Sequence, residues 1–218
     1  MKPTGFLGID SNLENVTVAD SSGDIVRYSV AKVAEIKSQY RQVKSHFTRN
    51  DVRVKRTVWG KYGQRERRRV DQALHKVSAE IVKRAERGGL GIGMEKLTGI
   101  RRLYSRRNNR GVESRFRLNS WSFAELQRKI EYKALWAGVP VIYVNPRGTS
   151  TECSKCGRRM KPEENRKQRC ACCGLEEDRD VNAARNILAR AVRFAAVAPQ
   201  VEAMQVSLQE GAKSIAAS

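Results

Sequence analysis

The first thirty residues alternate between short apolar runs and polar turns. Residues 5–9 form an apolar run that ends at the carboxylate of Asp10, and Val16 and Val18 belong to a second run. A Ser-Gly-Asp turn at residues 22–24 precedes a third run. Runs of this length, bounded by Gly, Ser and Asp, are typical of strands joined by tight turns. The sequence therefore predicts a three-stranded meander at the start of the chain.

A helical spacing replaces this pattern from about residue 33 to residue 88. Apolar side chains recur three or four residues apart, as at Leu74, Val77 and Ile81, and most of the remaining positions are basic. One face of this segment is expected to pack while another stays positively charged. The glycine-containing stretch at residues 59–63 is expected to break the helix.

Strands and helices then alternate. Residues 90–95 are predicted to form a strand, which again ends at a carboxylate, and residues 123–137 have the period of an amphipathic helix. A strand at residues 139–144 and a final helix over residues 184–191 complete the pattern. This order of elements predicts an α/β fold, with a mixed sheet flanked by helices.

Basic residues outnumber acidic ones, 43 Lys and Arg against 23 Asp and Glu, which gives a net charge of +20. A surface of this charge favours a polyanionic partner, and nucleic acid is the natural one. A solvated charged face explains individual arginines equally well. No apolar run is long enough to span a membrane or to act as a secretory signal, so we expect an intracellular, nucleoid-associated protein in the cytoplasm. The candidate nucleic-acid contacts are Arg65, Arg67, Arg68, Arg69, Arg101, Arg102, Arg106 and Arg107.

All five cysteines fall within 21 residues, which is typical of a metal site and not of a disulfide framework. They include two Cys-x-x-Cys-Gly knuckles, separated by 13 residues, that begin at Cys153 and Cys170. Such knuckles turn two thiolates toward one tetrahedral zinc, and the following glycine permits a positive φ. We predict a structural zinc ribbon with ligands Cys153, Cys156, Cys170 and Cys173, and with Cys172 as a bystander. A redox pair is the alternative, but redox motifs occur singly.

Three carboxylates stand at ends of predicted elements. Asp10 and Glu95 each close a strand, and Asp180 opens the last helix. Strand ends and helix starts of an α/β sheet meet along one edge, so these side chains are expected to gather there. Two divalent cations, Mg²⁺ or Mn²⁺, bound between such carboxylates would support phosphodiester cleavage. Pairing with surface Lys and Arg accounts for most of the other acidic residues.

Several motifs, in this order, resemble those of TnpB-type (OrfB) transposon-encoded proteins, and the match covers residues 5–195. The motifs are Gly8-Ile9-Asp10, Met94-Glu95-Lys96-Leu97, Glu131-Tyr132-Lys133-Ala134, Asn145-Pro146-Arg147-Gly148-Thr149-Ser150, the two cysteine knuckles and the stretch from Asp178 to Ile187. The resemblance implies an RNase H-like, RuvC-type nuclease, related to the type V CRISPR effectors, that cuts DNA under the guidance of an RNA. It assigns Asp10, Glu95 and Asp180 as catalytic magnesium ligands. Asp178 competes for the third position, which the family pattern gives to Asp180.

The resemblance also implies a domain division. Residues 1–149 would form the RuvC-like core, with the basic helical insertion at about 33–88, and residues 150–176 the zinc ribbon. Residues 177–197 would form the final helix of the core, and residues 198–218 a disordered tail.

Three departures from the family pattern are visible. Asn12 stands where the family usually has Gly, and Lys96 replaces an Asp. The family's N-terminal region, which reads guide RNA and a short target motif, is expected to be absent, so a separately encoded N-terminal half is an expected partner beside DNA and guide RNA. We therefore expect a transposon-associated, RNA-guided, metal-dependent DNA endonuclease. The alternative is a catalytically silent transposon remnant that binds DNA or RNA nonspecifically, and a zinc-ribbon adaptor for a partner protein is a weaker third.

Overall fold

The computed structural model describes residues 3–47, 51–97, 111, 116 and 121–216, with side chains as far as residue 197 except at residue 55. Arg101, Arg102, Arg106 and Arg107, predicted as nucleic-acid contacts, lie outside the described residues. The first sheet contains five strands in the order β3-β2-β1-β4-β5. Their bounds are β1 (Gly5–Ser11), β2 (Asn15–Asp20), β3 (Ile25–Ser29), β4 (Leu90–Glu95) and β5 (Val141–Val144).

The predicted meander is confirmed, because β1, β2 and β3 pair antiparallel in sequence order. β4 then pairs parallel to β1, and β5 parallel to β4. The ends of β1, β4 and β5 therefore point to the same edge of the sheet, and this edge carries Asp10 and Glu95. The mixed α/β architecture that the sequence predicts is confirmed.

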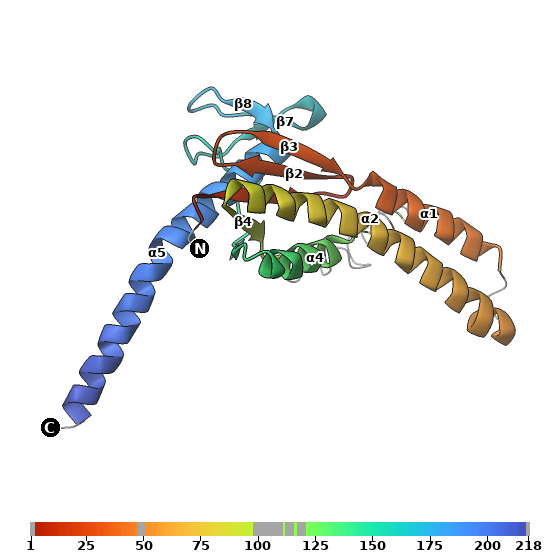
Figure 1. Cartoon of the computed structure of the whole chain (residues 1–218). Coiled ribbons are helices and arrows are strands. Elements are labelled where there is room, and N and C mark those ends of the chain that lie inside the picture. The colour runs from red at the N-terminus through yellow and green to blue at the C-terminus, as the bar shows by residue number, and fades with distance from the viewer. Residues whose placement is uncertain (1–2, 48–50, 98–110, 112–115, 117–120, 217–218) are drawn as a thin grey trace.

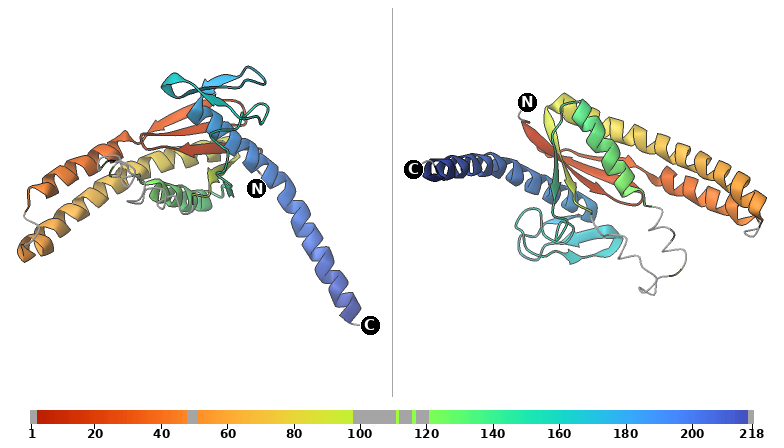
Figure 2. Two further views of the ribbon diagram at one scale, coloured as in Figure 1. Left: turned by 180° about the vertical axis from the view of Figure 1, so that it is seen from behind. Right: turned by 90° about the horizontal axis from the view of Figure 1, so that it is seen from below.

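Helices cover both faces of this sheet (Figure 1). α1 (Ala31–Ser45), α2 (Trp59–Gly88) and α4 (Phe123–Trp136) supply the apolar side chains that form the larger core with Leu7 and Ile9 of β1. α5 (Arg179–Ala216) packs on the other face, where Ile187 and Ala191 meet Phe6 of β1. Figure 2 shows the same two layers from behind and from below. The alternation of side chains along β1 thus sorts its residues between the two cores.

Two glycines let α5 approach the sheet closely. Gly8 of β1 and Gly93 of β4 are paired in register. A Cβ atom on Gly8 would lie 2.2 Å from the carbonyl oxygen of Ala184, and one on Gly93 would lie 2.6 Å from the side chain of Ala191. Because only glycine fits at these two positions, α5 can pack closely against β1 and β4. This close packing brings the first turn of α5 to the edge of the sheet beside Asp10.

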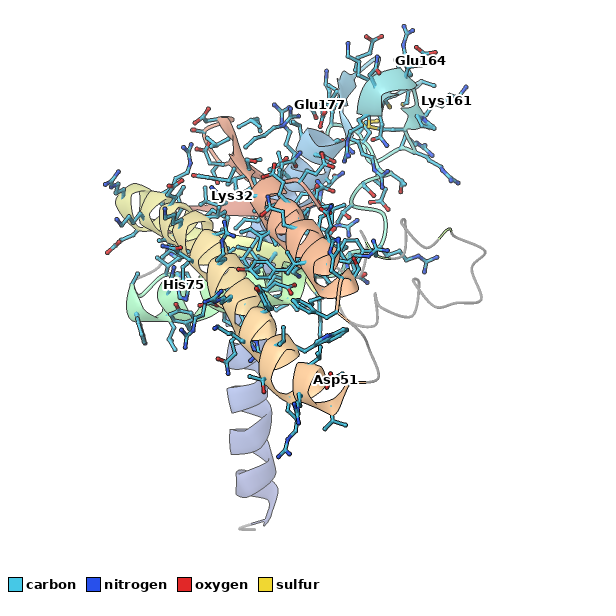
Figure 3. The ribbon with its side chains drawn as sticks, turned by 90° about the vertical axis from the view of Figure 1, so that its right-hand side faces the viewer. Lys32, Asp51, His75, Lys161, Glu164 and Glu177 are labelled. Atoms are coloured by element: carbon cyan, nitrogen blue, oxygen red, sulfur yellow. The ribbon has the colours of Figure 1, made fainter. Side chains whose placement is uncertain are left out.

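α1 and α2 form an arm that extends from the sheet, with Asp51 near its tip (Figure 3). The expected helix break at residues 59–63 is wrong, because these residues lie within α2 and the interruption comes earlier, after α1. A Cβ atom on Gly60 or Gly63 would meet nothing within 4 Å, so no close packing requires a turn there. A glycine inside a helix destabilises it by only about 1 kcal/mol relative to alanine. Asp51 instead restarts the helix, since its Oδ1 accepts the backbone N–H of Arg53 at 2.8 Å. A short π-helical stretch, η1 (Val54–Val58), leads into α2.

The cysteine-containing segment, residues 150–178, forms a second, three-stranded sheet in the order β6-β7-β8. β6 (Lys161–Pro162), β7 (Lys167–Arg169) and β8 (Glu176–Asp178) pair antiparallel, and a 3₁₀ turn, η3 (Glu164–Arg166), joins β6 to β7. β8 continues directly into α5. Because α5 begins beside Asp10, this connection places the cysteine-containing segment next to the edge that carries the carboxylates.

The structure continues α5 as a helix to Ala216, whereas the sequence analysis expected a disordered tail from residue 198. That expectation rested on the few apolar residues available for packing. The segment is nevertheless rich in Ala, Gln and Glu, which are strong helix formers. Within the described part of the chain, none of the helices has the length and apolar character required to cross a membrane.

Candidate active site and candidate zinc centre

Asp10 and Glu95 lie side by side at the ends of neighbouring strands. The parallel register pairs Ile9 with Met94, so the next residues along β1 and β4 are the two carboxylates. Neighbouring strands are about 4.8 Å apart, and side chains alternate between the faces of a sheet. Both carboxylates therefore project to the face that α5 covers, as Gly8 and Gly93 do.

Asp180 reaches the same place from the first turn of α5. It is 3% exposed, and its charge acts on Asp10. Asp178, the other candidate for the third ligand position, makes different contacts. Its Oδ1 accepts the backbone N–H of Asp180 at 2.9 Å, which caps the helix, and it pairs with Arg27 of β3 at 2.9 Å. The structure thus brings Asp180 to the carboxylate pair and uses Asp178 at the helix start.

Burial alters the acidity of two of these groups. Burial raises the pKa of Asp10 to about 7, with further contributions from the charges of Glu95 and Asp180. A hydrogen bond from Asn12 acts in the opposite direction. Burial also raises the pKa of Glu95, opposed by a hydrogen bond from the hydroxyl of Thr149 at 2.5 Å. A cation nearby would favour the ionised form of such carboxylates.

Asp180 pairs with Arg166, which comes from η3 of the cysteine-containing segment. Its Nη2 lies 2.5 Å from Oδ1 of Asp180. The sequence does not identify Arg166 as a site residue, because it lies in a polar loop among many other basic residues and no motif marks it. Thr149 was also missed as a site residue, although it belongs to the motif at residues 145–150 that carries part of the resemblance. That motif was the signal that could have found it.

The carboxylates suit divalent cations in type, because carboxylate oxygens are the ligands that Mg²⁺ and Mn²⁺ prefer. Among the described residues, the four cysteines form the group of Asp, Glu, His and Cys side chains gathered closely enough to bind one metal ion, and Asp10, Glu95 and Asp180 do not form such a group.

The four predicted zinc ligands converge on one point. The sulfur atoms of Cys153, Cys156, Cys170 and Cys173 all lie within 4.8 Å of one another. The sulfurs of Cys153 and Cys173 are 3.6 Å apart, and those of Cys156 and Cys170 are 3.5 Å apart. Zn–S bonds of about 2.3 Å in a tetrahedron place sulfurs about 3.8 Å apart. The cluster could therefore bind a zinc ion, and Cys172, exposed and outside the cluster, has no part in it.

The backbone of the knuckles also follows the expected pattern. Gly157 and Gly174 have φ angles of +74° and +72°. Their N–H groups donate to the carbonyls of Cys153 and Cys170, at 2.9 and 3.0 Å. Each glycine thus closes the turn that presents a pair of sulfurs, a conformation that side chains with a Cβ rarely adopt.

Side chains of α5 fasten the cysteine-containing segment to the sheet. Asn182 is fully buried and makes two hydrogen bonds to this segment, accepting from the N–H of Ser154 and donating to the carbonyl of Glu152. Asn186 donates to the carbonyls of Thr149 and Glu152. Asn182 and Asn186, which follow Asp180 in the motif from Asp178 to Ile187, therefore hold the segment that carries Arg166.

The basic arm offers a groove between α1 and α2. A cavity of about 420 Å³ is lined by Lys37, Arg41, Lys44 and Trp59, and also by Glu66, whose carboxylate pairs with Lys44 at 2.5 Å. An adjoining cavity of about 300 Å³ is lined partly by Arg67. Arg65 and Arg69 lie over the rings of Tyr62 and Tyr40, and Arg65, Arg67, Arg68 and Arg69 are all exposed.

Comparison with known proteins identifies the kind of molecule. Residues 123–187 match the family model described as Cas12f1-like, TNB domain. The chain is 36% identical over 191 residues to the TnpB-like protein MJ0751 of Methanocaldococcus jannaschii, covering 84% of this chain and 67% of the relative. It is 41% identical over 120 residues to the CRISPR-associated endodeoxyribonuclease Cas12f1 of Sulfoacidibacillus thermotolerans, covering 54% of this chain and 26% of that protein.

Solved structures support the fold. The structure of a Cas12f1–sgRNA–target DNA complex superposes with a TM-score of 0.63 at 22% identity, covering 86% of this chain and 50% of the Cas12f1 chain. A CRISPR–Cas12f ternary complex gives a TM-score of 0.62, covering 39% of that chain. The fold is RNase H-like, of the RuvC type found in the type V effectors. The chain belongs to the TnpB-like family, and it spans half or less of the Cas12f chains it resembles.

Proposed function

We propose that this chain carries the catalytic site of an RNA-guided, metal-dependent DNA endonuclease. One observation supports the proposal above the others. Asp10, Glu95 and Asp180 come from two parallel strands and a helix start that are far apart in the sequence, and they meet at one edge of the sheet. There burial, together with the charges of Glu95 and Asp180, raises the pKa of Asp10.

In this proposal Asp10, Glu95 and Asp180 hold Mg²⁺ or Mn²⁺. Bound there, two such ions would generate a water nucleophile and stabilise the leaving oxygen of a phosphodiester. Thr149 orients the carboxylate of Glu95 through its hydroxyl hydrogen bond. Burial of Asp180 excludes water from one side of the site.

Arg166 also has a role in the proposed reaction. Its guanidinium pairs with Asp180, and the negative charges of Asp178 and Asp10 further raise its pKa. The side chain remains 56% exposed, so a phosphate oxygen of the substrate can reach it. We assign it to contact the scissile phosphate, where a planar guanidinium supplies two parallel donors. The zinc ribbon, residues 150–176, then serves to carry Arg166 to the site.

The arm formed by α1 and α2 is proposed to bind the nucleic-acid backbone. Its groove combines cations with the ring of Trp59, which suits phosphates beside unstacked bases. The net charge of +20 favours the same partner. Relatives of this chain are solved as complexes with a guide RNA and target DNA, and we propose DNA and guide RNA as the partners here.

A cleavage assay tests the proposal. Labelled single-stranded DNA is incubated with an excess of the zinc-loaded chain and with Mg²⁺ or Mn²⁺, and product is followed for wild type and for Glu95→Gln. Glu86→Gln, an exposed carboxylate of α2, is the matched control. The proposal expects cleavage by wild type and Glu86→Gln and none by Glu95→Gln. Binding without any cleavage by the wild-type chain would instead favour a silent nucleic-acid-binding remnant.

A further inference from the structure

Asn12 contacts the proposed metal ligand Asp10 directly. It lies in the turn between β1 and β2, and its Nδ2 donates to Oδ2 of Asp10 at 2.7 Å. An amide donor on one carboxylate oxygen fixes the rotation of the carboxylate and leaves the other oxygen for a cation. The glycine that the family usually has at this position offers no such donor.

The backbone of Asn12 is itself held in place from two sides. Its N–H donates to the carbonyl of Asn15 at 2.9 Å, which closes the turn. Its carbonyl accepts the indole N–H of Trp121 at 3.0 Å. The side-chain amide of Asn12 therefore meets Asp10 from a fixed backbone.

Trp121 is in turn fixed by packing. Its ring lies 4.8 Å, centroid to centroid, from the ring of Phe123, which is buried at the first residue of α4. Trp121 and Asn12 also line the same small apolar cavity, together with Leu126. The contact from Trp121 thus ties the turn that carries Asn12 to the beginning of α4.

The same helix reaches the second carboxylate strand. Gln127 of α4 donates from Nε2 to the backbone carbonyl of Glu95 at 2.8 Å. α4 therefore contacts the end of β4 through Gln127, and Trp121, two residues before α4, contacts the turn that follows β1. This arrangement links the spacing of Asp10 and Glu95 to one helix.

We propose that Asn12 is a positioning residue, which together with Trp121 holds the Asp10 carboxylate in the orientation that a divalent cation requires. This inference rests on the proposed function, since it assumes that Asp10 is a metal ligand. Hydrogen-bond partners behind a ligating group typically contribute about 10–100-fold to metal affinity. Asn12 is such a partner of Asp10. Trp121 does not contact Asp10 but hydrogen-bonds to the backbone of Asn12.

The test measures Mn²⁺ affinity by electron paramagnetic resonance on the full, zinc-loaded chain. Asn12→Ala removes the donor and is expected to weaken Mn²⁺ binding by about 10-fold or more, whereas Asn12→Ser, which keeps a hydroxyl donor, recovers part of the affinity. Trp121→Phe keeps the ring packing but loses the indole N–H, so it is expected to weaken binding by a smaller factor. Trp136→Phe is the matched control, because Trp136 is 82% exposed at the other end of α4.

The outcomes separate this inference from the proposed function. If Asp10→Ala binds Mn²⁺ as wild type does, Asp10 is not a ligand and both proposals fail. If Asp10→Ala loses Mn²⁺ while Asn12→Ala and Trp121→Phe bind it with wild-type affinity, the role of Asn12 is overturned and the metal site stands. Melting temperatures of all variants are measured in parallel, and Trp121→Phe provides the answer should Asn12→Ala fail to fold.

Discussion

The guanidinium of Arg166 and the carboxylate of Asp180 form an ion pair between the cysteine-containing segment and the RuvC-type core, with Nη2 and Oδ1 2.5 Å apart. The pair joins η3, which lies between two strands of the three-stranded sheet, to the first turn of α5, which packs on the five-stranded sheet. It makes the proposed site a composite, because neither the five-stranded sheet nor the cysteine cluster contains all of its charged groups.

Removing the Arg166 guanidinium should impair cleavage more than folding. Arg166→Gln deletes a positive charge aimed at the reacting phosphate, and loss of one such stabilising group costs a factor on the order of 10² in rate. Single-turnover cleavage rates with saturating Mg²⁺ measure the effect. Arg169→Gln, which removes a guanidinium paired with Glu176 on the same ribbon, is the control and should cut at nearly the wild-type rate. Equal rates for both variants would place Arg166 outside the reaction.

The cysteine cluster should bind one zinc ion per chain. Cys156→Ser and Cys173→Ser each remove one of four ligands, so zinc content measured by mass spectrometry should fall and the melting temperature should drop. Cys172→Ser, whose sulfur lies outside the cluster, should retain both. Full zinc content in the first two variants would contradict the ligand set.

Neutralising Asp10 should stabilise the protein in a pH-dependent way when magnesium is absent. The pKa of Asp10 rises from 3.8 to about 7 on folding, so the ionised form opposes folding. This cost is absent below pH 4, grows between pH 4 and pH 7, and is complete above pH 7. Asp10→Asn should therefore unfold at higher denaturant concentration than wild type at pH 8, by up to about 4 kcal/mol in unfolding free energy, and nearly together with it at pH 4. Equal stabilities at pH 8 would contradict a cost of ionising Asp10 from its burial and from the charges of Glu95 and Asp180.

Gly8 should tolerate no side chain. A Cβ there would meet the backbone of α5 at 2.2 Å, so Gly8→Ala must displace α5 or β1 and should cost at least about 2 kcal/mol in unfolding free energy. Gly60→Ala is the matched control, because a Cβ on Gly60 meets nothing within 4 Å and alanine favours the helix by about 1 kcal/mol. Chemical denaturation of both variants measures the difference. An unchanged midpoint for Gly8→Ala would contradict the close packing of α5 on β1.

Local patterns in the sequence predict the elements, and the spacing of the cysteines predicts their cluster, because both depend on residues close together along the chain. The ends of β1 and β4 could also be predicted, since each apolar run stops at a carboxylate. Arg166 and Asn12 could not be predicted as site residues. Their contacts depend on how the cysteine-containing segment folds back on α5 and on how α4 meets the β1–β2 turn. Motif resemblance favoured Asp180 over Asp178, and only the structure shows that Asp178 caps α5.

The central claim is that Asp10, Glu95 and Asp180 together hold divalent cations. Crystals of the zinc-loaded chain grown with Mn²⁺ and a short single-stranded DNA allow the ions to be located by anomalous scattering. The account predicts manganese peaks within about 2.5 Å of oxygens of all three carboxylates, with Arg166 turned from Asp180 toward a phosphate. Manganese bound elsewhere, with the Arg166–Asp180 pair intact beside DNA, would contradict it.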